Sequence, residues 1–106
     1  MISEEPIIIR ARINDGTTKV TVLIKHPMER GDRKDIETGK IIPACFIQEV
    51  ACESAGRLVM SALWSGNVAK DPYLGFKFEG GKKGDPVKLS WVDNLGNSDS
   101  AETTIQ

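Results

Sequence analysis

The stretch Pro86-Val87-Lys88-Leu89-Ser90-Trp91 decides the fold class of this chain. Three apolar residues, Val87, Leu89 and Trp91, alternate with two polar ones, so that one face of the segment is apolar. A period of two residues predicts a half-buried β-strand, because successive side chains of a strand point to opposite faces. This stretch therefore indicates a protein built from β-sheets.

The same alternation recurs in six other short segments, which are residues 7–13, 17–25, 45–52, 58–64, 74–78 and 101–105. Turn signals such as Asn14-Asp15-Gly16 separate them about every 8 to 12 residues, and no segment shows a convincing helical period. These features predict an all-β fold, an immunoglobulin-like antiparallel β-sandwich of about seven strands, with residues 1–106 as a single domain. A small closed barrel is the alternative.

Strand phase also predicts which side chains share a face. In residues 45–52 we expect Phe46, Gln48, Val50 and Cys52 to lie on one face; in the next strand we expect the same of Leu58, Met60, Ala62 and Trp64.

Two connections are longer than a tight turn. Residues 65–72 predict one helical turn or a crossover between sheets, and residues 26–43 are too long for a passive hairpin loop.

Composition excludes several classes of function. The chain has 106 residues, of which 40% are hydrophobic and 27% charged, as in a folded globular domain. A formal net charge of −1 provides no cationic excess for binding nucleic acid. Nothing in the sequence approaches the run of about 18 apolar residues that a membrane-spanning helix needs.

Two cysteines and one histidine are the scarce chemical groups. On one extended strand Cys45 and Cys52 would lie ~23 Å apart at about 3.3 Å per residue, too far for a disulfide. We expect two free thiols, with Cys52 toward the core; the alternative is a reactive Cys45 activated by a basic neighbour such as His26. His26 and Met28 could be metal ligands, but we favour a histidine hydrogen-bonded within its loop, after Pro27 has ended the strand.

No arrangement of residues predicts an enzyme. The sequence offers no Gly-rich phosphate loop that opens a helix and no Ser-His-Asp order beyond chance. The run Glu29–Asp35 alternates in charge, which is typical of a solvated loop. A long charged loop is also a plausible docking element, in which Arg30 and Arg33 would pair with carboxylates of a partner. We expect no catalytic residue, cofactor or metal.

Five stretches, in this order and together, resemble the SoxZ family: Ile24–Asp35, Gly39–Pro43, Phe46–Val50, Asn67–Leu74 and Val87–Gly96. The resemblance extends from about residue 8 to the end of the chain, and its most specific part is the His-Pro-Met-Glu loop with the charged residues that follow it. Cys45 and Cys52 are not part of the family's pattern.

The resemblance implies a function that composition does not show. SoxZ-like proteins are the non-catalytic, immunoglobulin-like subunit of the SoxYZ carrier complex in thiosulfate oxidation, and they stabilise and present SoxY. The SoxY partner carries the sulfur substrate on a cysteine of its C-terminal arm. We therefore expect a heterodimer with a SoxY-like subunit and transient contacts with other sulfur-oxidation enzymes. The residues expected to face the partner are His26, Met28, Glu29, Arg30 and Arg33.

The acidic start of the chain, Met1–Pro6, does not read as a secretory signal and by itself suggests the cytosol. The resemblance implies instead a periplasmic protein, exported together with a partner that carries the signal. Two other functions remain as alternatives. A superoxide-reductase-like iron protein would need several histidines, and the chain has one; a stand-alone immunoglobulin-like ligand-binding module would need an aromatic surface, and only 6% of residues are aromatic.

Overall fold

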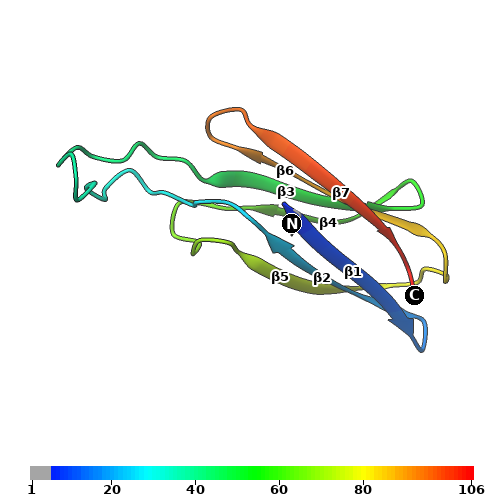
Figure 1. Cartoon of the computed structure of the whole chain (residues 1–106). Helices are drawn as coiled ribbons and strands as arrows, with labels where there is room; N and C mark the ends of the chain where they lie inside the picture. Colours follow the sequence, from blue (N-terminus) through cyan, green and yellow to red (C-terminus); the bar gives the residue numbers. More distant parts are fainter. Residues whose placement is uncertain (1–5) are drawn as a thin grey trace, which may run out of the picture.

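The computed structural model describes residues 6–106 as seven strands in two sheets (Figure 1). In chain order the strands are β1 (Ile7–Asn14), β2 (Thr17–Ile24), β3 (Ile47–Ser54), β4 (Arg57–Leu63), β5 (Tyr73–Glu79), β6 (Pro86–Asp93) and β7 (Ser98–Thr104). One sheet has the order β1-β2-β5 and the other β4-β3-β6-β7, and every pairing is antiparallel. This all-β arrangement in two sheets confirms the predicted immunoglobulin-like sandwich rather than a closed barrel.

Tight turns join neighbouring strands where the sequence predicts them. Between β1 and β2, Asp15 and Gly16 adopt φ of 53° and 78°. Two consecutive residues with positive φ form the type I′ turn, whose twist matches that of an antiparallel hairpin. The β1–β2 register therefore pairs Asn14 with Thr17 directly across this turn.

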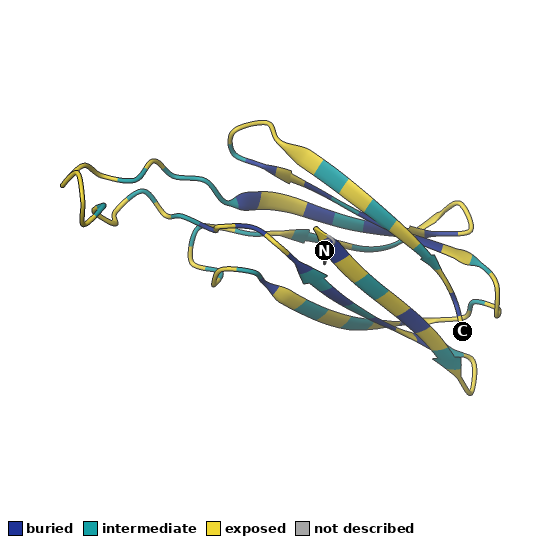
Figure 2. Ribbon diagram, in the orientation of Figure 1, coloured by how far each residue is buried: buried dark blue, intermediate teal, exposed yellow. Residues whose placement is uncertain are grey.

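The core lies between the two sheets and is filled by the inward face of each strand, which Figure 2 shows as alternating bands of burial. Each sheet contributes fully buried side chains, among them Val20, Val22, Ile24, Ile47, Val50, Cys52, Val87 and Leu89. At roughly 25 cal/mol per Å² of apolar surface, this shared burial is the main force that holds the sheets together. The predicted core-facing position of Cys52 is confirmed.

Two β-bulges overturn part of the predicted strand phase. The β3–β6 register shifts between Ile47 and Glu49, so Ile47 is fully buried, whereas Gln48, which was predicted to share the face of Val50, is exposed. A second shift, between Cys52 and Glu53 in the β3–β4 pairing, turns Leu58 outward with 58% of its surface exposed. A bulge adds one residue to one strand and so reverses the inward and outward positions beyond it.

The two long connections lie at the same end of the sandwich. Residues 64–72 carry the chain from β4 in one sheet to β5 in the other, as predicted, but they contain no helical turn. Residues 27–46, here called the arm, leave the sandwich and return to it (Figure 1). Backbone bridges between Glu29 and Cys45 and between Lys34 and Ile41 hold its two halves together. No helix among the described residues is long and apolar enough to cross a membrane.

Candidate functional site

A buried polar cluster closes the base of the arm. His26 follows β2, Asp93 ends β6, and Cys45 precedes β3, so the fold brings together residues from three parts of the chain. The His26 Nε2 atom lies 3.1 Å from Asp93 Oδ2, and the Cys45 Sγ atom lies 4.0 Å from His26 Nε2 and 3.9 Å from Asp93 Oδ2. His26 and Asp93 are only 5% and 2% exposed, and Asp93 is the most buried acidic residue in the described chain.

Asp93 is the centre of the cluster because both of its carboxylate oxygens accept hydrogen bonds. Oδ1 accepts the backbone N–H groups of Leu95 and Asn97 at 3.0 and 2.8 Å. Oδ2 accepts from the Asn97 side chain and from the His26 ring, both at 3.1 Å. Burial acts to raise the pKa of Asp93, but these hydrogen bonds outweigh it and hold the pKa below its ordinary value.

The proton on His26 can be assigned from its neighbours. The backbone N–H of Met28 donates to His26 Nδ1 at 3.1 Å, so Nδ1 is the unprotonated nitrogen. Nε2 therefore carries the proton of the neutral ring and donates it to Asp93. The ring also packs edge-to-face on Trp91, with centroids 5.0 Å apart. The predicted hydrogen bond of His26 within its own loop is confirmed, and the bond to Asp93 is added to it.

The three side chains also form a possible set of metal ligands, since their donor atoms all lie within 4.8 Å of one another. Their hydrogen bonds do not fit that role. A metal at this cluster would have to bind His26 through Nε2, which faces Asp93, but Nε2 is the nitrogen that carries the proton. Both oxygens of Asp93 are already occupied by four donors. The cluster is therefore built to fix the arm and the β6–β7 turn to the sandwich.

Neither cysteine is an activated nucleophile. Burial raises the pKa of the Cys45 thiol, and the Asp93 carboxylate raises it further by its charge and by accepting a hydrogen bond from the thiol. Burial, helped by Glu53, raises the pKa of Cys52 to about 11. Both cysteines are free, as predicted. Because the thiolate is the reactive form, the alternative of a Cys45 activated by His26 finds no support in this geometry.

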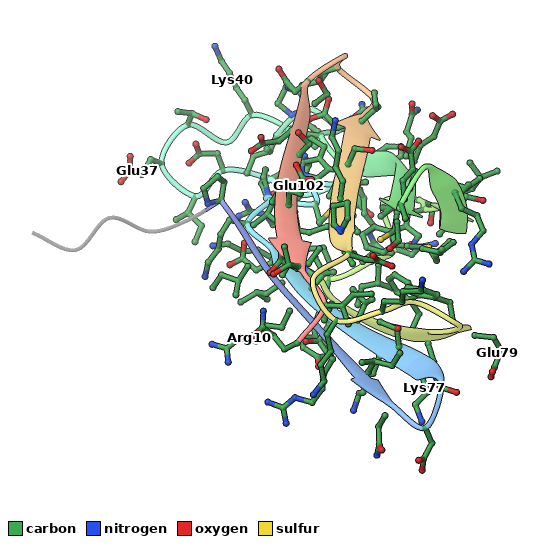
Figure 3. The ribbon with its side chains drawn as sticks, turned by 90° about the vertical axis from the view of Figure 1, so that its right-hand side faces the viewer. Arg10, Glu37, Lys40, Lys77, Glu79 and Glu102 are labelled. Atoms are coloured by element: carbon green, nitrogen blue, oxygen red, sulfur yellow. The ribbon has the colours of Figure 1, made fainter. Side chains whose placement is uncertain are left out.

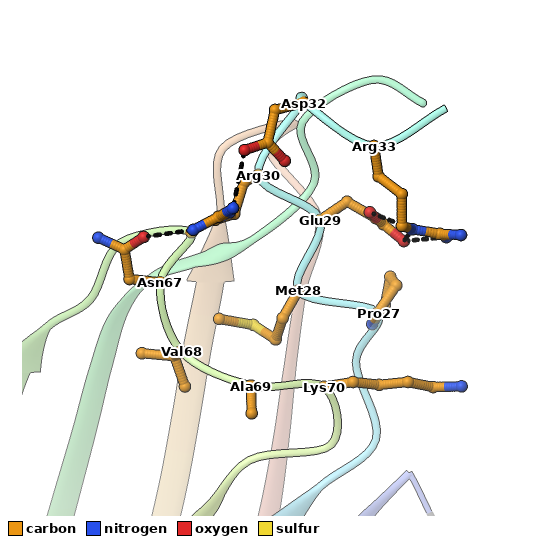
Figure 4. Close-up of a pocket in the computed structure, with 11 residues that line it drawn as sticks. Pro27, Met28, Glu29, Arg30, Asp32, Arg33, Asn67, Val68, Ala69 and Lys70 are labelled. Atoms are coloured by element: carbon orange, nitrogen blue, oxygen red, sulfur yellow. Dashed lines mark hydrogen bonds and ion pairs between the residues drawn. The ribbon is translucent and has the colours of Figure 1, made fainter. Parts of the chain in front are cut away.

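A groove of about 800 Å³ lies outside the cluster, between the arm and residues 66–70 (Figure 4). Arg30 spans it by donating to Asn67 at 3.2 Å and pairs with Asp32 at 2.8 Å. Arg33 forms a bidentate pair with Glu29, and this pair lowers the pKa of the carboxyl and raises that of the guanidinium. The groove is thus lined by charged groups that are paired with one another but remain accessible to a partner.

The five residues predicted to face a partner all lie at the start of the arm or just before it, but their side chains take two directions. Glu29, Arg30 and Arg33 line the groove. His26 is buried, and Met28, which also lines the groove, is only 6% exposed; the Met28 Sδ accepts the backbone N–H of Ile47 at 3.4 Å. The buried pair therefore positions the arm, while the three charged residues lie along the groove.

Asp93 was not identified as a site residue from the sequence. Its stretch, Asp93–Asn97, reads as a hairpin turn, and two of the Asp93 hydrogen bonds do stabilise that turn. The bond to His26, 67 residues away, depends on how the two sheets pack, and no local pattern carries that information. Cys45 had been considered beside His26, and the structure confirms that the two are neighbours.

Fold and site together define a small immunoglobulin-like β-sandwich with a charged arm that is fixed at its base. The family model described as "Sulphur oxidation protein SoxZ" matches residues 9–104. The chain therefore belongs to the SoxZ family and is a sulfur-oxidation protein. No curated protein matches it at a significant level.

Proposed function

We propose that the chain is the non-catalytic subunit of a SoxYZ sulfur-carrier complex in thiosulfate oxidation. In this role it binds, stabilises and presents a SoxY-like subunit, whose C-terminal cysteine carries the sulfur. The observation that carries the proposal is the SoxZ family match over residues 9–104, which spans all seven strands except the first two residues of β1.

The state of the two thiols supports a passive role in the sulfur chemistry. A cysteine that accepts sulfur must reach the thiolate form and meet its substrate. Cys52 is fully buried, and the pKa of each thiol is raised. The working thiol is therefore expected on the partner and not on this chain.

The arm supports a role in binding the partner. Its tip carries Ile36, which is 99% exposed, and Ile41, which is 51% exposed. Hydrogen bonds between Asp35 and Lys40 and between Ile42 and Arg33 order the backbone around these residues. Exposed apolar side chains on an ordered projection are typical anchors of a protein interface, because burying each of them against a partner is favourable.

Intact-mass analysis of the purified complex after thiosulfate oxidation tests the proposal. We expect sulfur adducts on the C-terminal cysteine of the SoxY-like subunit and unchanged mass for this chain. A Cys45→Ser variant and a Cys52→Ser variant should leave the adducts on the partner unchanged. An adduct on this chain, or loss of loading in either variant, would contradict the passive role.

The proposed compartment is the periplasm, reached together with a SoxY-like partner that bears the export signal. The proposal rests on what the resemblance to the SoxZ family implies. Cell fractionation tests it: the chain should enter the periplasm when the partner is co-expressed with its signal, and should stay in the cytoplasm when that signal is deleted. Export of this chain without the partner would contradict it.

A further inference from the structure

The outer face of the β1-β2-β5 sheet carries its charged side chains in rows set by strand register. Arg12, Lys19 and Lys77 stand opposite one another across the three strands. Arg10 heads the next row, beside Thr21 and Gly75. All four cations are exposed, and Figure 3 shows Arg10 and Lys77 extending from this sheet. We call Arg10, Arg12, Lys19 and Lys77 the basic face.

The basic face is not neutralised by the protein itself. Within residues 6–106, none of its four side chains forms an ion pair, and the nearest carboxylate in the register, Glu79, instead accepts a hydrogen bond from Thr17 at 3.3 Å. Neighbouring strands lie about 4.8 Å apart, and like charges directly opposite each other destabilise a sheet. A row of three cations therefore destabilises the fold. An overall excess of cations does not account for the row, because the net charge of the chain is −1.

The surface around these cations is suited to accepting an anionic group. A groove of about 500 Å³ is lined by Arg10, Ala11, Arg12, Lys19, Thr21, Thr103 and Gln106. Apart from that of Ala11, each of these side chains ends in a hydrogen-bond donor, and none is acidic. Acidic groups lie on the other sheet, where Glu49, Glu53 and Glu102 are exposed. Glu53 and Glu102 stand on either side of one cation, Lys88, and Glu49 pairs with no cation in the register. Cations thus outnumber carboxylates on the outer face of the β1-β2-β5 sheet, whereas exposed carboxylates outnumber exposed cations on the other sheet.

We propose that the basic face is the docking site for the carboxylate-rich surface of a transient protein partner, distinct from the stable partner subunit. Stable interfaces are depleted of charge at their centre, whereas charged patches accelerate and orient short-lived encounters. Nucleic acid fits poorly, because Tyr73 is the one aromatic side chain in the register rows of this face and stacking platforms are therefore missing. The inference depends on these charges alone and stands apart from the identity of the stable subunit.

A charge-reversal experiment on the full chain tests the proposal. The variant Arg12→Glu/Lys19→Glu/Lys77→Glu removes the central row, and Lys40→Glu/Lys82→Glu/Lys83→Glu makes the same charge change at exposed positions elsewhere. The probe is a synthetic peptide of glutamate residues, titrated by NMR at low and at physiological salt. We expect shifts centred on residues 10, 12, 19, 21 and 77, affinity that falls with salt, and a loss of at least about tenfold in the first variant but not in the second.

Other outcomes would overturn the proposal. Shifts spread evenly over all lysines, or equal losses in the two variants, would mean that the basic face is not a distinct site. A salt-sensitive dimer of this chain that the first variant abolishes would make a second copy the occupant. Loss of co-purification with a SoxY-like subunit in the first variant alone would make this face the stable interface; retained co-purification with lost peptide binding is the result that we expect.

Discussion

Asp93 is the residue on which the base of the arm depends. Its carboxylate holds a turn through Oδ1 and holds His26 through Oδ2, so it joins the β6–β7 turn to the end of β2. In Asp93→Asn an amide N–H would replace the acceptor that faces the protonated Nε2 of His26. Moving the ring proton to Nδ1 would oppose it to the Met28 N–H. Turning the amide over would oppose its N–H group to the backbone N–H groups of Leu95 and Asn97. We expect a loss of about 1–3 kcal/mol, the cost of leaving a buried polar group unpaired.

The same substitution should change the dependence of stability on pH. Because the pKa of Asp93 is lowered in the folded state, its contribution is complete above the ordinary carboxyl pKa and is lost as the pH falls through the folded value. The wild type and Asp93→Asn should therefore differ less in free energy of unfolding below about pH 4, as measured by urea unfolding curves. Glu102→Gln, at an exposed position, is the control and should track the wild type. A constant gap between the Asp93 variant and the wild type would contradict this account.

At the residue scale, the sequence predicts partners that are close along the chain better than partners that are distant. The bond from the Met28 N–H to His26 spans two residues, and a histidine held within its loop was predicted. The strands β2 and β6 belong to different sheets. The contact between His26 and Asp93 requires both strands to finish at the same end of the sandwich. That coincidence is a property of packing, so Asp93 could be recognised from sequence only as a turn residue.

Among the elements, the turn between β5 and β6 provides a test of backbone geometry. Gly81 has φ of +96°, and a Cβ added there would lie 2.6 Å from Thr18 Oγ1 and 2.9 Å from Ile105 Cδ1. Both neighbours are almost fully buried, and Thr18 is fixed by donating to the Gly80 carbonyl, so neither can move aside. We expect Gly81→Ala to lose about 1–3 kcal/mol more than strain at positive φ alone would cost.

Gly84, three residues further along the same turn, is the matched control. It has φ of +91°, but an added Cβ would meet nothing within 4 Å. Gly84→Ala should therefore show only the left-handed backbone penalty of about 1–2 kcal/mol. Thermal and urea unfolding of the two variants measure the difference. Equal losses would mean that the close contacts at Gly81 relax at no cost.

The positions of the strands could be predicted because the alternation that marks a strand is local. Which face each side chain lies on could not always be predicted. Alternation locates all seven strands to within a few residues, since a half-buried strand needs it wherever the strand lies. The bulges at Ile47/Glu49 and Cys52/Glu53 depend on how β3 pairs with its two neighbours. They reversed the expected direction of Gln48 and Leu58, because a bulge is a property of a pair of strands and not of one sequence.

The whole molecule exposes an apolar side chain far from its own core. The arm extends the molecule along its longest dimension, 53 Å against 35 and 21 Å, and ends in a fully exposed isoleucine. That isoleucine adds nothing to the core, so a partner that covers it would stabilise the folded state.

Binding of the proposed SoxY-like subunit should therefore raise the thermal stability of this chain in a concentration-dependent way. A ligand that binds only the folded state, at a hundredfold excess over its Kd, adds about 2.7 kcal/mol, and each kcal/mol raises the Tm of a domain of this size by about 4–8 °C. Ile36→Asp should change the free energy of unfolding of the isolated chain by no more than the ~0.5 kcal/mol typical of surface substitutions. It should reduce the rise in Tm that the partner produces. Leu95→Asp makes the same chemical change at a 61% exposed site outside the arm and should keep the full shift.

If both variants reduce the shift equally, the arm tip is not the anchor; if the partner produces no shift in the wild type, the proposed complex does not form. The two results separate the role of the arm from the existence of the complex, because only the first leaves a partner-dependent Tm in place.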